Sequence, residues 1–353
     1  MAKYIEIATK LEKRIRHGDY RLRSFPSHAA LVTELEANPR TVTKALDMLI
    51  DRGFLIRQRT GRVILPDQND KAVMHLGLVA PAYPTSLTFL WHRGIHGMVQ
   101  GRGWELKFVP YTHWEDTGIT DALQGLDGVF FIGIGDNIPP EVLDRMRQSD
   151  TPVVALEVDT SAKGLPCIRL SNPADIHKLL NHLRDRGHQR VDCLNTQPMN
   201  PIIRDRIQSW QLWSAAHEAS GTLINEPVHV FGPPVEQAYR VAIEAIRANR
   251  LQSSALFCVT SAAAFGVMRA LQDTGRRVGK DIDICAGDDS GHMAEYSNPS
   301  LTCLKDPNIK PYIHACLNWF ARGGRDWVGS LLIQPFDSPL FIGESTGGAS
   351  PMP

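Results

Sequence analysis

Apolar residues repeat at helical spacing in three short stretches near the N-terminus. Residues 3–17 predict a first helix, and Ser27 is a suitable N-cap for a second. The third stretch, residues 38–53, opens with Asn38-Pro39, in which Asn is a strong N-cap and Pro is tolerated at the first helical position. Each stretch has one apolar stripe, so the three helices can share a core.

The third helix carries a polar first turn beside its apolar stripe. The stripe starts at Val42 and follows i, i+3, i+4, i+7, and Gly53 is placed to end the helix in a left-handed cap. A recognition helix in the major groove of DNA presents such a polar turn, although an ordinary amphipathic surface helix shows the same pattern. The residues of this turn that could donate to phosphates or base edges are Arg40, Thr41, Thr43 and Lys44.

Two β-prone runs follow this helix, at residues 54–57 and 62–65. Gly61 between them permits a tight turn with positive φ, which predicts a β-hairpin. Three helices and a basic hairpin indicate a winged helix-turn-helix domain. The hairpin residues suited to phosphates or the minor groove are Arg57, Arg59 and Arg62.

From His75 onward the pattern changes to apolar strands that alternate with helices. This alternation predicts an α/β fold with doubly wound parallel sheets, and it restarts after Pro166. Two such halves bracket a cleft, and ligands bind at the carboxyl ends of parallel strands. The predicted strands are 76–80, 104–109, 128–132 and 151–156 in the first half, then 167–170, 190–194, 228–231, 255–259 and 282–286 in the second.

A polar segment separates the two parts of the chain. Residues 66–74 begin with a strand-breaking Pro and are predicted to form the interdomain linker. The expected domains are therefore a winged helix-turn-helix at residues 1–65 and an effector-binding and dimerisation domain at residues 75–346.

The charge of the chain is divided between these parts. Residues 1–65 hold 13 Lys and Arg against 7 Asp and Glu, a net charge of +6, which leaves −6 on the rest because the 353-residue chain is neutral. A basic end on an acidic body indicates a polyanionic partner for that end, although a solvated charged surface would give the same balance.

Composition limits the remaining classes. With 43% hydrophobic and 22% charged residues the chain is typical of a soluble globular protein, and it has no apolar run of ~18 residues that could span a membrane. No signal peptide is visible, so a cytoplasmic location is expected. The 6 cysteines are widely spaced, which favours buried reduced thiols. His92, His96 and His113 fit no closed metal-ligand spacing, so we expect neither a metal nor a cofactor.

Motifs of the N-terminal part occur in a characteristic order and spacing. They are Tyr4…Ile7-Ala8…Leu11…Ile15…Gly18-Asp19-Tyr20, Phe25-Pro26-Ser27, Asn38-Pro39-Arg40-Thr41-Val42, Ala45-Leu46…Leu49 and Gly53-Phe54-Leu55. With them this part resembles the DNA-binding domain of GntR-family transcription regulators. Many members have Ser-Arg in place of Asn38-Pro39 and Arg in place of Thr43, which leaves the operator sequence open. The candidate DNA contacts are Ser27, His28, Asn38, Arg40, Thr41, Thr43, Lys44, Arg57, Arg59 and Arg62.

A second set of motifs spans the rest of the chain. They are residues 126–131, 151–154, 183–191 and 286–289, with a tail from 299–303 through 342–346. They resemble the LacI/GalR-type effector domain, a two-lobed relative of periplasmic sugar-binding proteins, and the whole then resembles arabinose-repressor-like regulators. The resemblance implies that the chain crosses three times between two lobes. Lobe 1 is expected at about 75–165 plus 303–325, and lobe 2 at about 166–302 plus the C-terminal tail.

The same resemblance implies where a ligand binds. The family's Arg-x-x-Gly-aromatic pattern, whose Arg clamps effector hydroxyls, falls on residues 206–210, with Ser209 in place of Gly. Asp288 and Glu157 follow strands at positions where acids contact ligand, although an Asp here also suits an Asx turn. Thr260 stands where the family has a sugar-binding Asn, which leaves open an atypical sugar or a ligand that is no sugar.

Aromatic residues after the first strand could form an apolar wall against a sugar ring, although aromatics at helical spacing are more often core. They are Tyr83, Phe89 and Trp91. The predicted ligand-binding residues are then Tyr83, Phe89, Glu157, Arg206, Thr260 and Asp288.

Together these patterns predict a transcription repressor that binds a two-fold DNA operator as a homodimer. A sugar or sugar derivative bound between the lobes would control its operator affinity. The alternatives are a regulator with another effector, such as a purine, and a ligand-binding protein or enzyme with an incidental basic head. An enzyme is not expected, because residues 133–135 lack the third Gly of a dinucleotide fingerprint and no activated nucleophile is evident.

Overall fold

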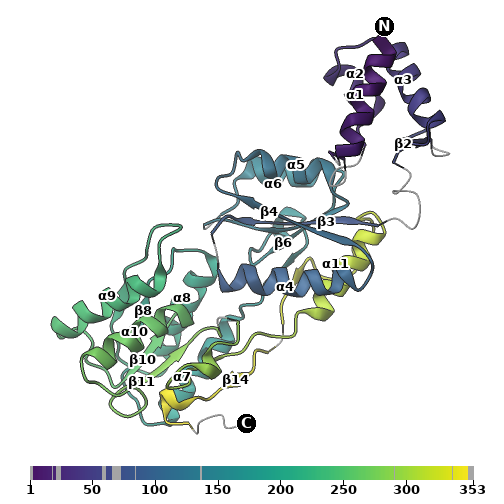
Figure 1. Ribbon diagram of the computed structural model, residues 1–353. Helices are drawn as coiled ribbons and strands as arrows, with labels where there is room; N and C mark the ends of the chain where they lie inside the picture. Colours follow the sequence, from purple (N-terminus) through teal and green to yellow (C-terminus); the bar gives the residue numbers. More distant parts are fainter. Residues whose placement is uncertain are drawn as a thin grey trace.

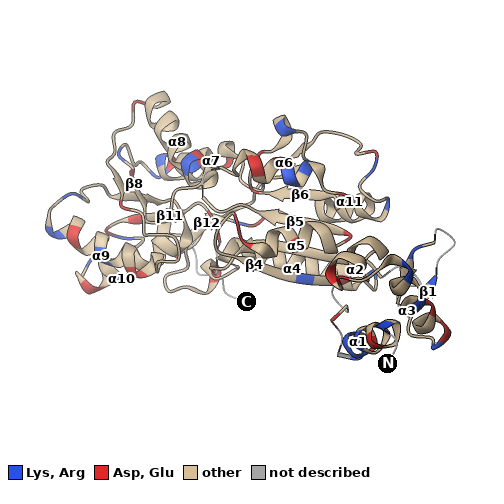
Figure 2. Ribbon diagram, turned by 90° about the horizontal axis from the view of Figure 1, so that it is seen from above, with Lys and Arg blue, Asp and Glu red and all other residues tan. Residues whose placement is uncertain are grey.

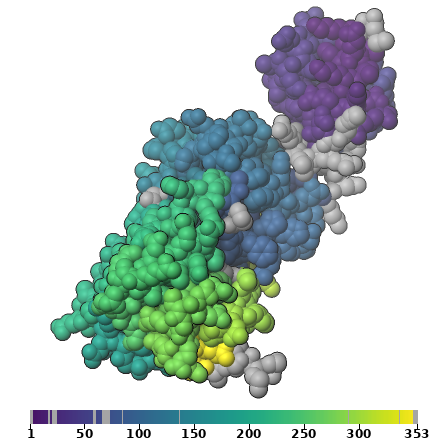
Figure 3. Space-filling model, turned by 60° about the vertical axis from the view of Figure 1, so that its left-hand side comes forward, coloured from purple at the N-terminus to yellow at the C-terminus, as the bar shows by residue number. Residues whose placement is uncertain are grey.

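The computed structural model describes an N-terminal head and a two-lobed body (Figure 1). Arg59 and residues 66–72 of the expected linker lie outside the described residues. In Figure 3 the head, coloured purple, lies beyond the first lobe. The described residues are 3–17, 19–20, 25–57, 61–65, 73–83, 85–135, 137–289, 291–335 and 337–348.

The head consists of three helices and a two-stranded antiparallel hairpin. Its core is formed by buried residues of all three helices, among them Leu11, Leu31 and Leu49. Gly53 and Gly61 both have positive φ, 75° and 84°, as expected of the helix end and the hairpin turn. The elements are α1 (Lys3–His17), α2 (His28–Glu34), α3 (Pro39–Asp51), β1 (Ile56–Arg57) and β2 (Val63–Ile64).

Lobe 1 is a parallel sheet with strand order β13-β7-β6-β5-β3-β4. Apolar residues of α4 and α11 pack on one face and those of α5 and α6 on the other. The strands are β3 (His75–Pro81), β4 (Glu105–Tyr111), β5 (Gly128–Ile132), β6 (Val153–Leu156), β7 (Cys167–Ile168) and β13 (Leu332–Ile333). The helices are α4 (Ser86–Gln100), α5 (Thr117–Gly125), α6 (Pro140–Gln148) and α11 (Lys310–Ala321).

Lobe 2 repeats this layering with strand order β14-β12-β11-β10-β8-β9, in which β14 alone is antiparallel. Helices α9 and α10 cover one face, and α7 and α8 the other. The strands are β8 (Asp192–Asn195), β9 (Leu223–Asn225), β10 (Ala255–Cys258), β11 (Asp283–Ala286), β12 (Thr302–Leu304) and β14 (Leu340–Phe341). The helices are α7 (Pro173–Asp185), α8 (Pro201–Ala216), α9 (Pro234–Arg247) and α10 (Ser261–Asp273).

The sheets correct the expected lobe boundaries. β7, expected to open lobe 2, pairs with β6 and β13 and therefore belongs to lobe 1. β12, expected in lobe 1, pairs with β11 in lobe 2. The chain leaves lobe 1 after β7, returns between β12 and α11, and leaves again between β13 and β14, so the three implied crossings are present.

The strand predicted at 228–231 is wrong. The edge strand of lobe 2 is β9, which ends at Asn225. Pro227 follows it and has no backbone N–H to continue a ladder, and Phe231 has a φ of 76°, outside the β region.

The remaining sequence features are placed as follows. All six cysteines are buried and unpaired, as expected of reduced thiols. Basic and acidic residues both occur over the head (Figure 2). Within the described part of the chain, no helix is both long enough and apolar enough to cross a bilayer.

Candidate functional site

A cavity of about 270 Å³ lies between the two lobes. Its lining includes residues that directly follow strands of both sheets, as expected for doubly wound folds. The N-cap residues of four helices also border it, so partial positive charge from four helix N-termini is directed toward its contents. These N-caps are Thr85 of α4, Asn172 of α7, Asn200 of α8 and Thr260 of α10.

Arg206 and Asp288 meet in the wall of lobe 2. Arg206 Nη1 donates to Asp288 Oδ2 at 2.6 Å and to the backbone oxygen of Val259 at 2.9 Å. The side chains of Arg206 and Asp288 are 11% and 21% exposed. Gly287 allows this approach, because a Cβ there would lie 3.2 Å from Arg206 Nε. That Nε is buried and has no hydrogen-bond partner in the described structure, so the guanidinium keeps donor capacity for a ligand.

Asp288 is also held from α10. Its Oδ1 accepts from the backbone N–H of Ser261 at 3.0 Å and from the Ser261 hydroxyl. Thr260, the N-cap of α10, accepts from Ala263 N–H and from Gln197 Nε2, both at 3.3 Å. One carboxylate oxygen of Asp288 therefore binds the first turn of α10, and the other orients Arg206 at the cavity.

Glu157 lines the cavity, and each of its oxygens already accepts a hydrogen bond from the protein. Its Oε1 accepts from Trp91 Nε1 at 2.9 Å and its Oε2 from Leu170 N–H at 3.1 Å. Burial raises the pKa of this carboxyl to about 7, because the lowering effects of Trp91, Leu170, Arg169 and Arg206 do not offset the loss of solvent.

The three aromatic candidates have different positions. Tyr83 of lobe 1 lines the cavity, and its ring lies edge-on to Phe231 of lobe 2, with centroids 5.1 Å apart. Phe89 does not line the cavity, contrary to expectation: it is 57% exposed on α4, with Arg93 over its ring. Trp91 is fully buried in the lobe 1 core, where its indole N–H donates a hydrogen bond to Glu157. The helical phase of α4 puts neighbouring aromatic positions on different faces.

Among the described residues, three side-chain contacts join the lobes around the cavity. Besides the Tyr83–Phe231 contact, Arg169 at the end of β7 forms an ion pair with Asp205 of α8. The third contact joins Arg93 of α4 to His292, which follows β11, with Arg93 Nη2 3.2 Å from His292 Nε2.

Several lining residues were not predicted from the sequence. They are Asn172, Gln197, Asn200 and Asp306. A signal existed for two of them, since Asn172-Pro173 and Asn200-Pro201 repeat the N-cap pattern of Asn38-Pro39. Asp306 lies in the crossing from β12 to α11, whose place at the cavity depends on the lobe topology.

The head presents a basic surface at the start of α3. Arg40 and Lys44 are exposed and form no hydrogen bond or ion pair with any residue that the structure describes, whereas Thr43 Oγ1 lies 3.0 Å from His28 Nε2. Asn38 caps the helix by accepting from Arg40 N–H at 2.9 Å. Ser27 likewise caps α2 through Ala30 N–H.

The remaining candidate DNA contacts lie on α3 and the hairpin. Thr41 is half-buried in the first turn of α3. Arg57 of the hairpin pairs with Asp47 of α3 at 2.5 Å, so it fastens the hairpin to the helix. Arg62 is exposed beside Gly61.

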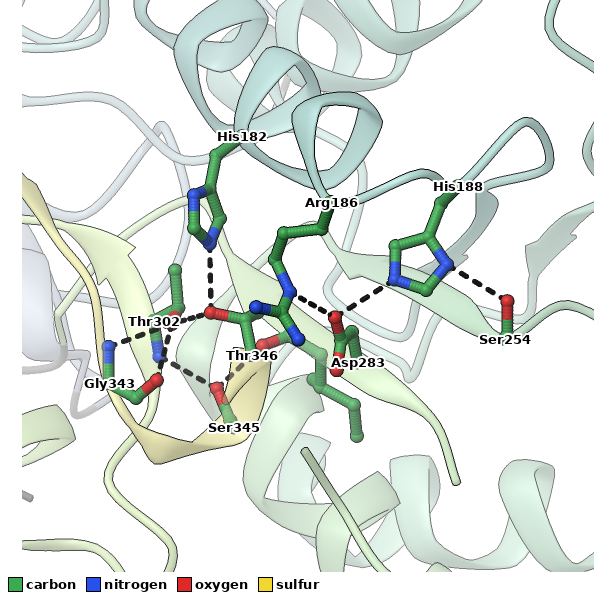
Figure 4. Close-up of polar contacts among 10 residues, drawn as sticks. His182, Arg186, His188, Ser254, Asp283, Thr302, Gly343, Ser345 and Thr346 are labelled. Carbon is green, nitrogen blue, oxygen red and sulfur yellow. Dashed lines mark hydrogen bonds and ion pairs between the residues drawn. The ribbon is translucent and has the colours of Figure 1, made fainter. Parts of the chain in front are cut away.

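A second polar cluster is formed by residues of α7, β11 and the C-terminal segment (Figure 4). His188 is 2.9 Å from both Ser254 Oγ and Asp283 Oδ2, an order of groups that also occurs in hydrolases. Asp283 also accepts from Arg186 at 2.6 Å, and none of these residues lines the cavity. The cluster ties α7 to β11, while His182 and Thr346 tie α7 to the C-terminal segment.

Comparison with known proteins agrees with the fold. Residues 180–309 match the family model of the periplasmic binding protein-like domain. The lac repressor dimer bound to operator and the anti-inducer ONPF superposes with a TM-score of 0.65 at 18% identity, covering 79% of this chain and 96% of that one. A LacI family regulator from Arthrobacter sp. FB24, in complex with lactose, gives 0.65 at 18% identity over 77% and 99%. The body therefore has the two-lobed periplasmic-binding-protein-like fold.

Sequence relatives are similar over a shorter span. The HTH-type transcriptional repressor PurR of Vibrio vulnificus is 32% identical over 167 residues, 47% of this chain and 48% of that protein. The HTH-type transcriptional repressor CytR of Escherichia coli is 21% identical over 185 residues, 52% of each. The chain thus spans about half the length of the relatives it matches.

Proposed function

We propose that this protein is a transcription repressor whose operator affinity is controlled by a small molecule bound between the lobes. The observation that carries the proposal is the combination of two sites in one chain. Arg40 and Lys44 stand free on a capped helix of the head, and a polar cavity lies between the lobes of the body. Repressors among the sequence relatives support the same reading.

We propose further that the head is a winged helix of GntR type. The β1–β2 hairpin directly after α3 supports this assignment, because a wing beside the recognition helix can contact the adjacent backbone or minor groove. In this arrangement α3 enters the major groove with Arg40, Thr41 and Lys44 toward the bases and phosphates. Arg62 then belongs to the wing.

A second copy of the chain is the partner we propose for an apolar face of the body. Phe89, Phe108 and Met293 are exposed by 57%, 40% and 61%. They are linked through neighbouring side chains, since His92 lies edge-on to Phe108 and Arg93 bridges Phe89 to His292. Dimerisation through this face would cover apolar surface and supply two heads for a two-fold operator.

The ligand is proposed to be a hydroxylated molecule of sugar size. Arg206, Asp288 and Thr260 offer donors and acceptors in one wall, while Tyr83 and aliphatic residues supply apolar surface. Similar structures hold lactose or ribose. A volume of about 270 Å³ is slightly below the ~300–1,000 Å³ range of ligand pockets, which favours a single ring.

A gel shift with genomic fragments tests the regulator directly. At ~150 mM salt, where non-specific binding is weak, the protein should select a limited set of fragments with two-fold symmetry. The Arg40→Ala variant should lose that selection. Equal retention of all fragments by the wild type, or none, would count against a sequence-specific regulator.

A further inference from the structure

The four helix N-termini at the cavity direct partial positive charge into it, whereas its charged side chains are largely compensated in pairs. Arg206 faces Asp288 at 2.6 Å, and Lys178 neutralises Asp175 at 2.7 Å. Lys305 Nζ lies 2.9 Å from Asp289 Oδ2 and also pairs with Glu295, so it has no charge to spare for a ligand.

Asp306 is the exception. Among the described residues none forms a hydrogen bond or ion pair with it, although it is half-buried and lines the cavity. Burial and the nearby carboxylates of Asp288 and Asp289 raise its pKa to about 6, against the lowering effect of His292 and Arg206. An acid that is poorly hydrated and repelled by its neighbours favours a cationic partner.

We infer that the ligand carries a protonated amine, bound by Asp306, on a hydroxylated frame whose oxygen accepts a hydrogen bond from Arg206. An ammonium group offers three donors and the positive charge that would neutralise Asp306. The buried Arg206 Nε has no acceptor in the described structure and can donate to a ligand oxygen. With the single-ring size of the cavity, the class is an amino sugar or an aminocyclitol. This inference rests on the proposed function, because it names the ligand of the same site.

A neutral sugar fits these groups less well. Its hydroxyls could donate to Asp306, but the charge of the carboxylate would remain unpaired beside Asp288 and Asp289. The crossing that carries Asp306 leads from lobe 2 to lobe 1, so an amine held there would also bear on how the lobes are joined.

Calorimetric titration of the full chain tests the inference. The probes are glucosamine, galactosamine and mannosamine beside their parent sugars, with hypoxanthine as an uncharged base, each up to about 10 mM to include weak millimolar binding. At least one amino sugar should bind about tenfold or more tightly than its parent. Asp306→Asn should remove this preference, because it removes the charge and keeps the shape. Asp150→Asn, an equal change of charge at an exposed site outside the cavity, should retain it.

The outcomes are separable. Asp306→Asn should melt no lower than the wild type, since it loses no partner and relieves the repulsion from Asp288 and Asp289, and a folded variant makes the titration interpretable. Tighter binding of a parent sugar or of hypoxanthine, an unchanged preference in Asp306→Asn, or no binding of any amino sugar overturns the inference. The titration contains no DNA, so the ligand class can fail while operator binding persists, and the reverse.

Discussion

Glu157 shows how much of the site rests on single residues. It is 4% exposed and has a φ of 66°, a conformation uncommon outside glycine. Both carboxylate oxygens are bound, by Trp91 and by the Leu170 N–H, so the side chain joins α4 to the end of β7 beneath the cavity. Its place after a strand was predictable from the pattern, but its partner Trp91, 66 positions away, was not.

The raised pKa of Glu157 predicts a pH-dependent stability. The folded protein holds a proton up to about pH 7, whereas the unfolded chain loses it near its ordinary pKa of 4.5. Between these values the unfolding free energy therefore falls as pH rises, by roughly 1.4 kcal/mol per unit or ~3 kcal/mol in all. Glu157→Gln cannot ionise and should lack this component, although its amide nitrogen facing the Leu170 N–H adds a constant cost.

Urea unfolding of both proteins at pH 5 and pH 8 measures this difference. Other groups titrate in both proteins, so the informative quantity is the wild-type value minus the variant value. That difference should become less favourable to the wild type at the higher pH. Parallel pH profiles would show that Glu157 has no raised pKa.

At the scale of elements, the helix ends that depend on neighbouring residues were predictable from the sequence. Asn38 caps α3 and Gly53 ends it, as predicted, because capping depends on residues within one turn. Residues 228–231 have the composition of a strand, but Pro227 before them and Pro233 after them limit backbone pairing, and the edge strand ends at Asn225. No sequence pattern distinguished Gly266, at which α9 and α10 approach each other closely, from the other glycines.

Two helical glycines should respond to alanine in opposite directions. A Cβ on Gly266 of α10 would lie 2.3 Å from the Val235 oxygen and 2.7 Å from Ala238 Cβ of α9. Gly266→Ala should therefore lower the unfolding free energy by about 1–3 kcal/mol, since backbone and helix must shift. Gly97 of α4 is exposed and its Cβ would meet nothing within 4 Å. Gly97→Ala should instead stabilise by about 0.5–1 kcal/mol.

Chemical denaturation of the two variants checks this pair, with each serving as the control of the other. Stabilisation by Gly266→Ala would mean that α9 and α10 are not in contact at that point.

Two variants of α3 should distinguish a contact to the bases from a contact to the phosphates. Arg40→Ala is expected to cost about 1–3 kcal/mol on the operator if the guanidinium binds a base edge bidentately, and to relax selectivity. Lys44→Ala should weaken all sequences alike and reduce the salt dependence by about one ion, as expected of a phosphate contact.

Binding isotherms at several salt concentrations distinguish these roles. Lys10→Ala, which removes an exposed lysine of α1 outside the proposed DNA contacts, is the matched control and should leave operator selectivity unchanged. Unchanged operator affinity in Arg40→Ala would remove that residue from the interface.

At the scale of the whole molecule, the two-lobed architecture was predictable, and the assignment of segments to lobes was only partly so. Alternating strands and helices indicate doubly wound sheets wherever they occur, which is a local inference. Strand pairing is not local. β7 pairs with β13 in lobe 1 and β12 pairs with β14 in lobe 2, so each lies in the lobe opposite to the expected one. The same crossings bring Asp306 to the cavity, which is why the resemblance located Arg206 and Asp288 but not Asp306.

Control of the head by the cavity is the last prediction. A dimer fits a two-fold operator when its recognition helices lie about one helical turn, ~34 Å, apart, so a change in the lobe angle can spoil the fit. A ligand shifts this balance only if it binds the two lobe arrangements with different affinity. Arg206 is suited to create that difference, because it joins α8 to Val259 and Asp288 at the cavity wall.

Arg206→Ala should therefore bind the operator as the wild type does, yet require at least about tenfold more ligand for the same response, since a hydrogen bond to a charged group is lost. The measurement is a gel shift across a ligand series, using a sugar or amino sugar to which the wild type responds, with exposed Gln208→Ala on the same helix as control. A wild-type ligand response in Arg206→Ala would show that Arg206 does not clamp the ligand. If the ligand instead changes the association state in ultracentrifugation, control runs through dimerisation rather than through the spacing of the heads.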